Sequence, residues 1–176
     1  PRFVDNWAAS ALAMRAGGQI GRVGLFVDAD DGTLAENIKG GRLDAVQLHG
    51  SESPDRAAQV RKTFGLPVWK VIGVASAQDV SRADAYAEAA DLILFDARTP
   101  NGALPGGMGL KFDWSLLSGW KGRPGWGLAG GLTVQNVAGA VAETGAPLID
   151  AASGVEGAPG VKDVDKIAAF CEAARA

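Results

Sequence analysis

The stretch DLILFDA, residues 91–97, is an apolar run with a carboxylate near its end. Five other short runs have the same β-rich character. They are RVGLFVD (22–28), DAVQLHG (44–50), PVWKVIGV (67–74), GWGLAGG (125–131) and PLIDAASG (147–154). Their apolar residues are nearly continuous rather than alternating, which is typical of parallel strands covered on both faces. The sequence therefore predicts six parallel strands.

Helical spacing of apolar residues separates these runs. The clearest case is 54–64, because Ser53 can cap its start, Pro54 suits its first position and Gly65 follows its end. The other expected helices are 5–15, 34–39, 77–89, 133–143 and 163–174. Alternation of strands and helices predicts an α/β fold with a parallel sheet.

Two α/β architectures compete for this pattern. A doubly wound sheet of the dinucleotide-binding kind would carry G-x-G-x-x-G after its first strand, and the chain has no such motif there. A (β/α)₈ barrel spends about 31 residues on each unit, close to the spacing of about 29 found here. Polar residues and glycines also recur where the runs end. We therefore predict one domain over residues 1–176, a (β/α)₈ barrel with about six of its eight βα units in this chain.

The composition and net charge of the chain argue against several classes of function. The chain is 47% hydrophobic and 21% charged, as expected for a folded domain, and its net charge of −3 argues against nucleic-acid or membrane-surface partners. No apolar run approaches the roughly 20 residues of a membrane span. The single cysteine, Cys171, permits no internal disulfide and suits the cytoplasm. The single histidine, His49, excludes a metal site built on several histidines.

Two glycine motifs end the last two runs. GLAGGLT carries Gly130 and Gly131, and DAASGVE carries Ser153 and Gly154. Glycines before a helix let backbone N–H groups approach an anion, although each motif alone also fits a tight turn. The loops after the last two strands of a barrel often share a phosphate site. Together the motifs predict phosphate binding.

Asp96, at the end of its run, is a candidate general acid or base, with a loop cap as the alternative. The loop after it is long and carries Gly106, Gly107 and Gly109, so it is a candidate lid that excludes water.

Gln47 and His49 lie two residues apart and so face the same way on a strand. We expect both to point into the mouth of the barrel, with a hydrogen-bonded interior pair as the alternative.

The motifs VGLFVD, DAVQLHGSE, LILFDA, GGMGLKFDW, LAGGLTVQNV and DAASGVEGAPGVKD occur in this order. With their spacing, they resemble the phosphoribosylanthranilate isomerase family. The resemblance implies a barrel enzyme of tryptophan biosynthesis that needs no cofactor or metal. It would convert a small phosphoribosyl substrate, N-(5-phosphoribosyl)anthranilate, to 1-(2-carboxyphenylamino)-1-deoxyribulose 5-phosphate. Such an enzyme is expected in the cytoplasm, as a monomer or homodimer, without nucleic acid or membrane.

The resemblance also implies roles for individual residues. Asp96 matches the family's general acid, which protonates the furanose oxygen. The other matches are Arg2, Gln47 and His49 for the rest of the substrate, and Gly130, Gly131, Ser153 and Gly154 for its phosphate.

One part of the family pattern is missing. The family's general base is a cysteine in a K-I-C-G segment that ends the first strand, and this chain has no such segment. By the pattern, the chain begins after the second strand of the barrel and lacks the first βα unit and that strand. The alternative function is therefore a barrel fragment that binds a sugar phosphate or a partner chain without catalysis.

Overall fold

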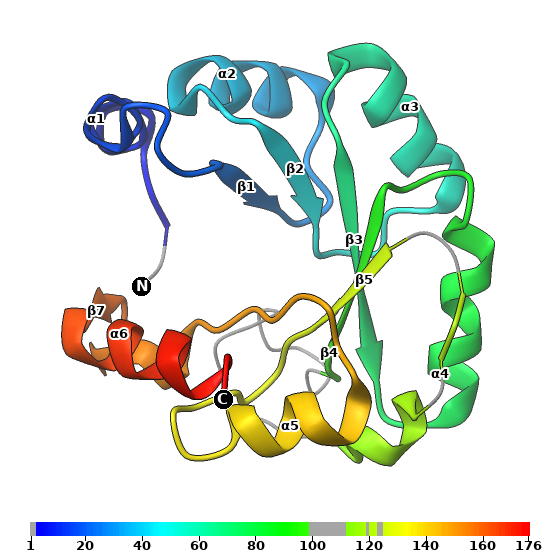
Figure 1. The fold of residues 1–176 in the computed structure, drawn as a ribbon. Helices are drawn as coiled ribbons and strands as arrows, with labels where there is room; N and C mark the ends of the chain where they lie inside the picture. The colour runs from blue at the N-terminus through cyan, green and yellow to red at the C-terminus, as the bar shows by residue number, and fades with distance from the viewer. Residues whose placement is uncertain (1–2, 99–111, 119, 123–124) are drawn as a thin grey trace.

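The computed structural model describes residues 3–98, 112–118, 120–122 and 125–176. Five parallel strands form one sheet in the order β1-β2-β3-β4-β5 (Figure 1). They are β1 (Val23–Phe26), β2 (Ala45–Leu48), β3 (Val68–Val74), β4 (Leu92–Ala97) and β5 (Gly125–Leu128). Each neighbour in the sheet is also the next strand in the chain. The prediction of a parallel α/β fold is confirmed.

The sixth predicted strand, 147–154, is only partly formed. Ile149 makes a single parallel bridge with Leu128, at the end of β5. Leu128 donates its N–H to Leu148 O, and Asp150 donates its N–H to Leu128 O. The segment therefore continues the strand order beyond β5. The chain then enters a separate antiparallel pair, β6 (Glu156–Ala158) and β7 (Val161–Lys162).

The helices lie around the outer side of the curved sheet, and α1 and α6 stand at the two ends of the arc (Figure 1). The α-helices are α1 (Asn6–Ala16), α2 (Asp31–Gly41), α3 (Pro54–Phe64), α4 (Ala77–Ser81), α5 (Val137–Thr144) and α6 (Val164–Ala173). Short 3₁₀ helices are η1 (Arg82–Tyr86), η2 (Trp114–Leu117) and η3 (Ser153–Val155). None of the helices in these described parts is long and apolar enough to cross a membrane.

Capping explains which helix boundaries were predictable. For α3 the predicted bounds are confirmed, because Ser53 Oγ accepts a hydrogen bond from Arg56 N and Gly65 adopts a left-handed φ of 65°. The predicted stop of α2 at its two glycines is wrong. The helix includes both of them and ends at Gly41, followed by Arg42, which caps it with a left-handed φ of 46°.

Two other helices are shorter than predicted. The stretch 77–89 forms the five residues of α4 and then turns into η1. The predicted start of α5 at Thr133 is wrong, because the helix begins at Val137. Asn136 explains this delay, since its side chain accepts a hydrogen bond from Thr133 N and donates one to Gly131 O. Those bonds stabilise a turn in place of the first helical turn.

The hydrophobic core lies between the sheet and the helices. Alternate residues of the strands, such as Leu48, Ile72 and Phe95, are almost fully buried in it. Phe95 also meets Trp120 and Trp126 edge-on, at centroid distances of 5.2 and 5.9 Å. Alternation along the strands directs their other residues to the opposite, inner face, where the candidate site residues follow.

Candidate active site

Asp96 is a buried carboxylate within β4, at the carboxyl end of the sheet. Its Oδ1 accepts a hydrogen bond of 2.7 Å from Ala97 N. Its Oδ2 lies 3.3 Å from Nε2 of His49, the residue that follows β2. Both oxygens are therefore held in place, and the carboxylate cannot rotate freely. The contact with His49 joins two of the predicted site residues across the end of β3.

The imidazole of His49 is left with one free nitrogen. Its Nδ1 is buried and finds no hydrogen-bond partner among the residues that the structure describes. An unpaired buried polar atom costs about 1–3 kcal/mol, so such an atom in a native protein calls for an explanation. A bound ligand that supplies the missing hydrogen bond is one such explanation.

Gly130 makes room for the Asp96 carboxylate. It has a φ of 86°, and a Cβ added there would lie 2.5 Å from Ala97 N and 2.7 Å from Asp96 Oδ1. A side chain at this position would collide with the backbone of β4 and with the acid itself. The sequence motif predicts Gly130 only in a phosphate site, whereas in the structure Gly130 also lies against Asp96.

The two glycine motifs touch each other. A Cβ added to Gly154 would lie 1.8 Å from Leu132 O and 3.1 Å from Thr133 Cα. Gly154 therefore packs directly on the loop that follows Gly131, and Ser153 precedes it at the start of η3. In the described part of the chain, the N–H groups of Gly130 and Gly131 donate to no protein acceptor. Neither N–H group has a partner among the described residues, whereas that of Thr133 donates to Asn136 Oδ1.

A second carboxyl group, Asp150, belongs to the same end of the sheet. Burial raises its pKa, and the charge of Asp96 raises it further, while His49 and Lys162 oppose the shift. By its solvent-accessible area, Asp150 is exposed. Asp150 was not predicted as a site residue, although it is a carboxylate on the β-rich run 147–154, which ends in a glycine motif.

The remaining predicted residues are placed only in part. Gln47 is buried in β2, two residues before His49. Arg2 and the predicted lid glycines Gly106, Gly107 and Gly109 lie outside the described residues. Within the described parts of the chain, no group of three or more His, Cys, Asp or Glu side chains could hold a metal ion.

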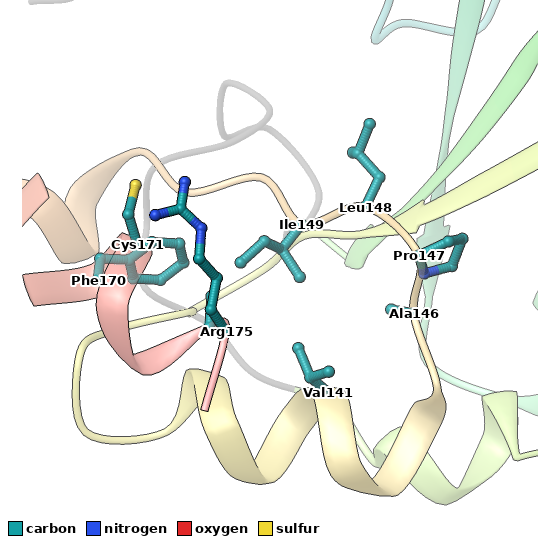
Figure 2. Close-up of a pocket in the computed structure, with 9 residues that line it drawn as sticks. Val141, Ala146, Pro147, Leu148, Ile149, Phe170, Cys171 and Arg175 are labelled. Atoms are coloured by element: carbon teal, nitrogen blue, oxygen red, sulfur yellow. The ribbon is translucent and has the colours of Figure 1, made fainter. Parts of the chain in front are cut away.

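A separate hollow lies between α5, the segment 146–149 and α6 (Figure 2). Its volume is about 320 Å³, and apolar side chains line most of it, together with Cys171 of α6 and Arg175, which follows that helix. It contains none of the residues assigned above to the carboxyl end of the sheet. Cys171 is exposed.

The fold and the site together define a class of protein. It is an α/β protein with a parallel sheet, whose carboxyl edge carries a fixed acid, an imidazole and a glycine-lined turn with free N–H groups. Residues 3–173 match the family described as N-(5'phosphoribosyl)anthranilate (PRA) isomerase. The chain belongs to this family.

Individual relatives agree with this assignment. The N-(5'-phosphoribosyl)anthranilate isomerase of Paramagnetospirillum magneticum is 52% identical over 176 residues, which cover 99% of this chain and 82% of that protein. The enzyme of Cereibacter sphaeroides is 53% identical, with 99% and 83% covered. The crystal structure of the Thermotoga maritima enzyme superposes with a TM-score of 0.86 at 32% identity, covering 98% of this chain and 82% of that one.

A further solved structure carries a ligand. It is a phosphoribosyl anthranilate isomerase in complex with reduced 1-(o-carboxyphenylamino)-1-deoxyribulose 5-phosphate. It has a TM-score of 0.81 at 28% identity, and the match covers 98% of this chain and 80% of that chain.

Proposed function

We propose that the protein is an isomerase of tryptophan biosynthesis that converts N-(5-phosphoribosyl)anthranilate to 1-(2-carboxyphenylamino)-1-deoxyribulose 5-phosphate. Relatives that carry this name match nearly the whole chain at about half identity. A neighbouring structure of the family holds a reduced form of the product. The observation that carries the proposal is the close approach of Gly130 to Asp96, since a Cβ added at Gly130 would lie 2.7 Å from Asp96 Oδ1.

Asp96 acts in this proposal as the general acid. Its proton goes to the furanose ring oxygen, the bond from that oxygen to C1 breaks, and an iminium forms with the anthranilate nitrogen. A general base then removes the proton on C2, which gives an enolamine that tautomerises to the ketone. The contact with His49 and the hydrogen bond from Ala97 N hold the side chain of Asp96 in one orientation for the proton transfer.

The glycine-lined turn takes the phosphate in this proposal. The N–H groups of Gly130 and Gly131 can donate to phosphate oxygens, and Gly154 brings the end of the segment 147–154 against the same turn. Ser153 adds a hydroxyl and an N–H from that side. Backbone N–H groups at such a turn can hold a phosphate through hydrogen bonds alone.

Other parts of the proposal rest on the sequence. Gln47, His49 and Arg2 contact the rest of the substrate, and the glycine-rich loop closes over it. The complete fold is a (β/α)₈ barrel, of which this chain supplies about six units. A cysteine base outside this chain, a cytoplasmic location and a monomeric or homodimeric state stay predictions.

The test is the variant Asp96→Asn, assayed for turnover of the phosphoribosyl substrate. Loss of a general acid should lower kcat roughly a hundredfold to ten-thousandfold while KM changes little. Asp55→Asn, on the exposed first turn of α3, is the matched control and should keep full activity.

Turnover in Asp96→Asn close to the wild-type rate would refute the role of Asp96. A wild-type protein that binds the reduced product but never turns over substrate would favour the alternative function, a fragment that binds without catalysis.

A further inference from the structure

A buried ion pair lies on the helix side of the sheet, away from the substrate. Lys70 of β3 and Glu52, in the turn after β2, each expose 3% of their side chains, and Lys70 Nζ lies 2.8 Å from Glu52 Oε2. Removing two charges from water costs several kcal/mol for each ion, and the ion pair offsets this cost only when further hydrogen bonds complete it. The hydrogen bonds of this pair are therefore informative.

These hydrogen bonds connect the ion pair to the end of β2, to the turn between β2 and α3, and to Asp28, which lies beyond the end of β1. Lys70 Nζ also donates to Gly50 O at 2.7 Å and, more weakly, to Leu48 O at 3.4 Å. Glu52 Oε2 accepts from Gly50 N at 2.9 Å, and Glu52 Oε1 accepts from Asp28 N at 2.8 Å. The pair thus joins the ends of β1 and β2 to Lys70 within β3.

These contacts enclose His49 on both sides. The ammonium binds the carbonyl groups of Leu48 and Gly50, and the carboxylate binds the N–H of Gly50. His49 N itself donates to Phe26 O at 2.8 Å. The backbone of His49 is therefore fixed on the helix side, while its ring lies on the other side against Asp96.

We propose that Glu52 and Lys70 are positioning residues for the active site: they fix the turn so that the His49 imidazole stays against the Asp96 carboxylate. Stability alone does not require such a pair, because a buried ion pair replaced by apolar residues of similar volume is often neutral or more stable. The inference rests on the proposed function for its effect on catalysis, but its structural part does not.

His49 is the only histidine in the 176 residues, so its imidazole signals in an NMR spectrum need no assignment by elimination. The main variant is Glu52→Leu combined with Lys70→Met, which removes both charges together and leaves no buried charge unpaired. Tyr86→Phe is the matched control. It removes the hydrogen bond from the Tyr86 hydroxyl to Glu52 O but leaves the ion pair intact.

In the wild type, Asp96→Asn should shift the His49 imidazole resonances, because the two side chains touch. In the double variant this response should be lost, and kcat should fall roughly tenfold to a hundredfold with KM nearly unchanged. Tyr86→Phe should keep both the response and the rate.

A folded double variant that keeps the wild-type His49 resonances, their response to Asp96→Asn and the wild-type kcat would overturn the proposal. If the double variant does not fold, Glu52→Gln decides by the same His49 signals. If the wild type shows no isomerase activity, the proposed function fails, but the NMR response still tests the positioning role.

Discussion

Substituting alanine for Gly154 should separate the two glycine motifs. The added Cβ would lie 1.8 Å from Leu132 O, 2.9 Å from Leu132 C and 3.1 Å from Thr133 Cα. All three atoms belong to the backbone, so no side chain can rotate away. Ordinary contact needs about 3.5 Å, and the two segments must therefore move apart by more than 1 Å or so.

The energetic cost follows from this displacement. Overpacking of a buried site costs typically 1–3 kcal/mol. We expect Gly154→Ala to reach the upper end, about 3 kcal/mol, because only backbone can yield. With a urea dependence of roughly 2–3 kcal/mol per molar, the unfolding midpoint should fall by about 1 M. Tryptophan fluorescence can follow this transition, since Trp120 and Trp126 are partly buried and pack against the core.

The same variant should weaken phosphate binding. Displacing Gly154 from the turn after Gly131 disturbs both halves of the proposed phosphate site, so KM should rise more than kcat falls. Gly139→Ala is the matched control. Gly139 lies within α5 with nothing near its added Cβ, and alanine should stabilise the helix by about 0.5–1 kcal/mol. A wild-type midpoint together with a wild-type KM in Gly154→Ala would refute the packing argument.

Two further predictions concern the carboxyl groups. Gly130→Ala should displace Asp96 and lower kcat at least tenfold or so, because its Cβ would meet both the acid and Ala97 N; a variant with wild-type kcat would contradict this. Asp150→Asn should alter the pH dependence of stability. Folding raises the pKa of Asp150, so the protonated carboxyl is favoured in the folded state. The resulting contribution to the free energy of unfolding is fully present below the pKa of the unfolded chain, near 3.9, and is lost as pH rises through the pKa of the folded state. Urea unfolding at several pH values should thus show the variant gaining on the wild type from about pH 3 to pH 7, whereas a constant difference would contradict it.

Local signals in the sequence were sufficient where a single residue decides the outcome. Ser53, Pro54 and Gly65 bound α3 as predicted, because each satisfies or omits a backbone group at a helix end. The same reasoning failed at the start of α5, because the Asn136 side chain competes for the backbone of Thr133 and Gly131. That competition depends on the path of the turn, which no residue-by-residue pattern contains.

The site shows the same division between local and long-range information. Asp96 and His49 stand at strand ends, so the order of parallel strands was enough to bring them to one edge. The Glu52–Lys70 pair was not predicted, because Lys70 lies inside a β-rich run and strand alternation turns it toward the helices. Recognising it requires the register of Leu48 opposite Lys70, which brings Gly50 and Glu52 within its reach.

Gly130 and Gly154 fit both an anion-binding motif and a requirement for close packing at this edge of the sheet. A glycine that frees backbone N–H groups for an anion and a glycine that lets two chains touch look alike in sequence. Here the steric requirement is explicit, since a Cβ at either position would strike the backbone of a neighbouring segment. Close approach of those segments is also what brings the free N–H groups of the turn near Asp96. A site that must hold a phosphate and protonate the attached sugar needs both groups within the length of one ribose, and side chains at these two positions would keep them apart. In the proposed site, the two glycines would therefore set the distance between acid and anion as well as bind the anion.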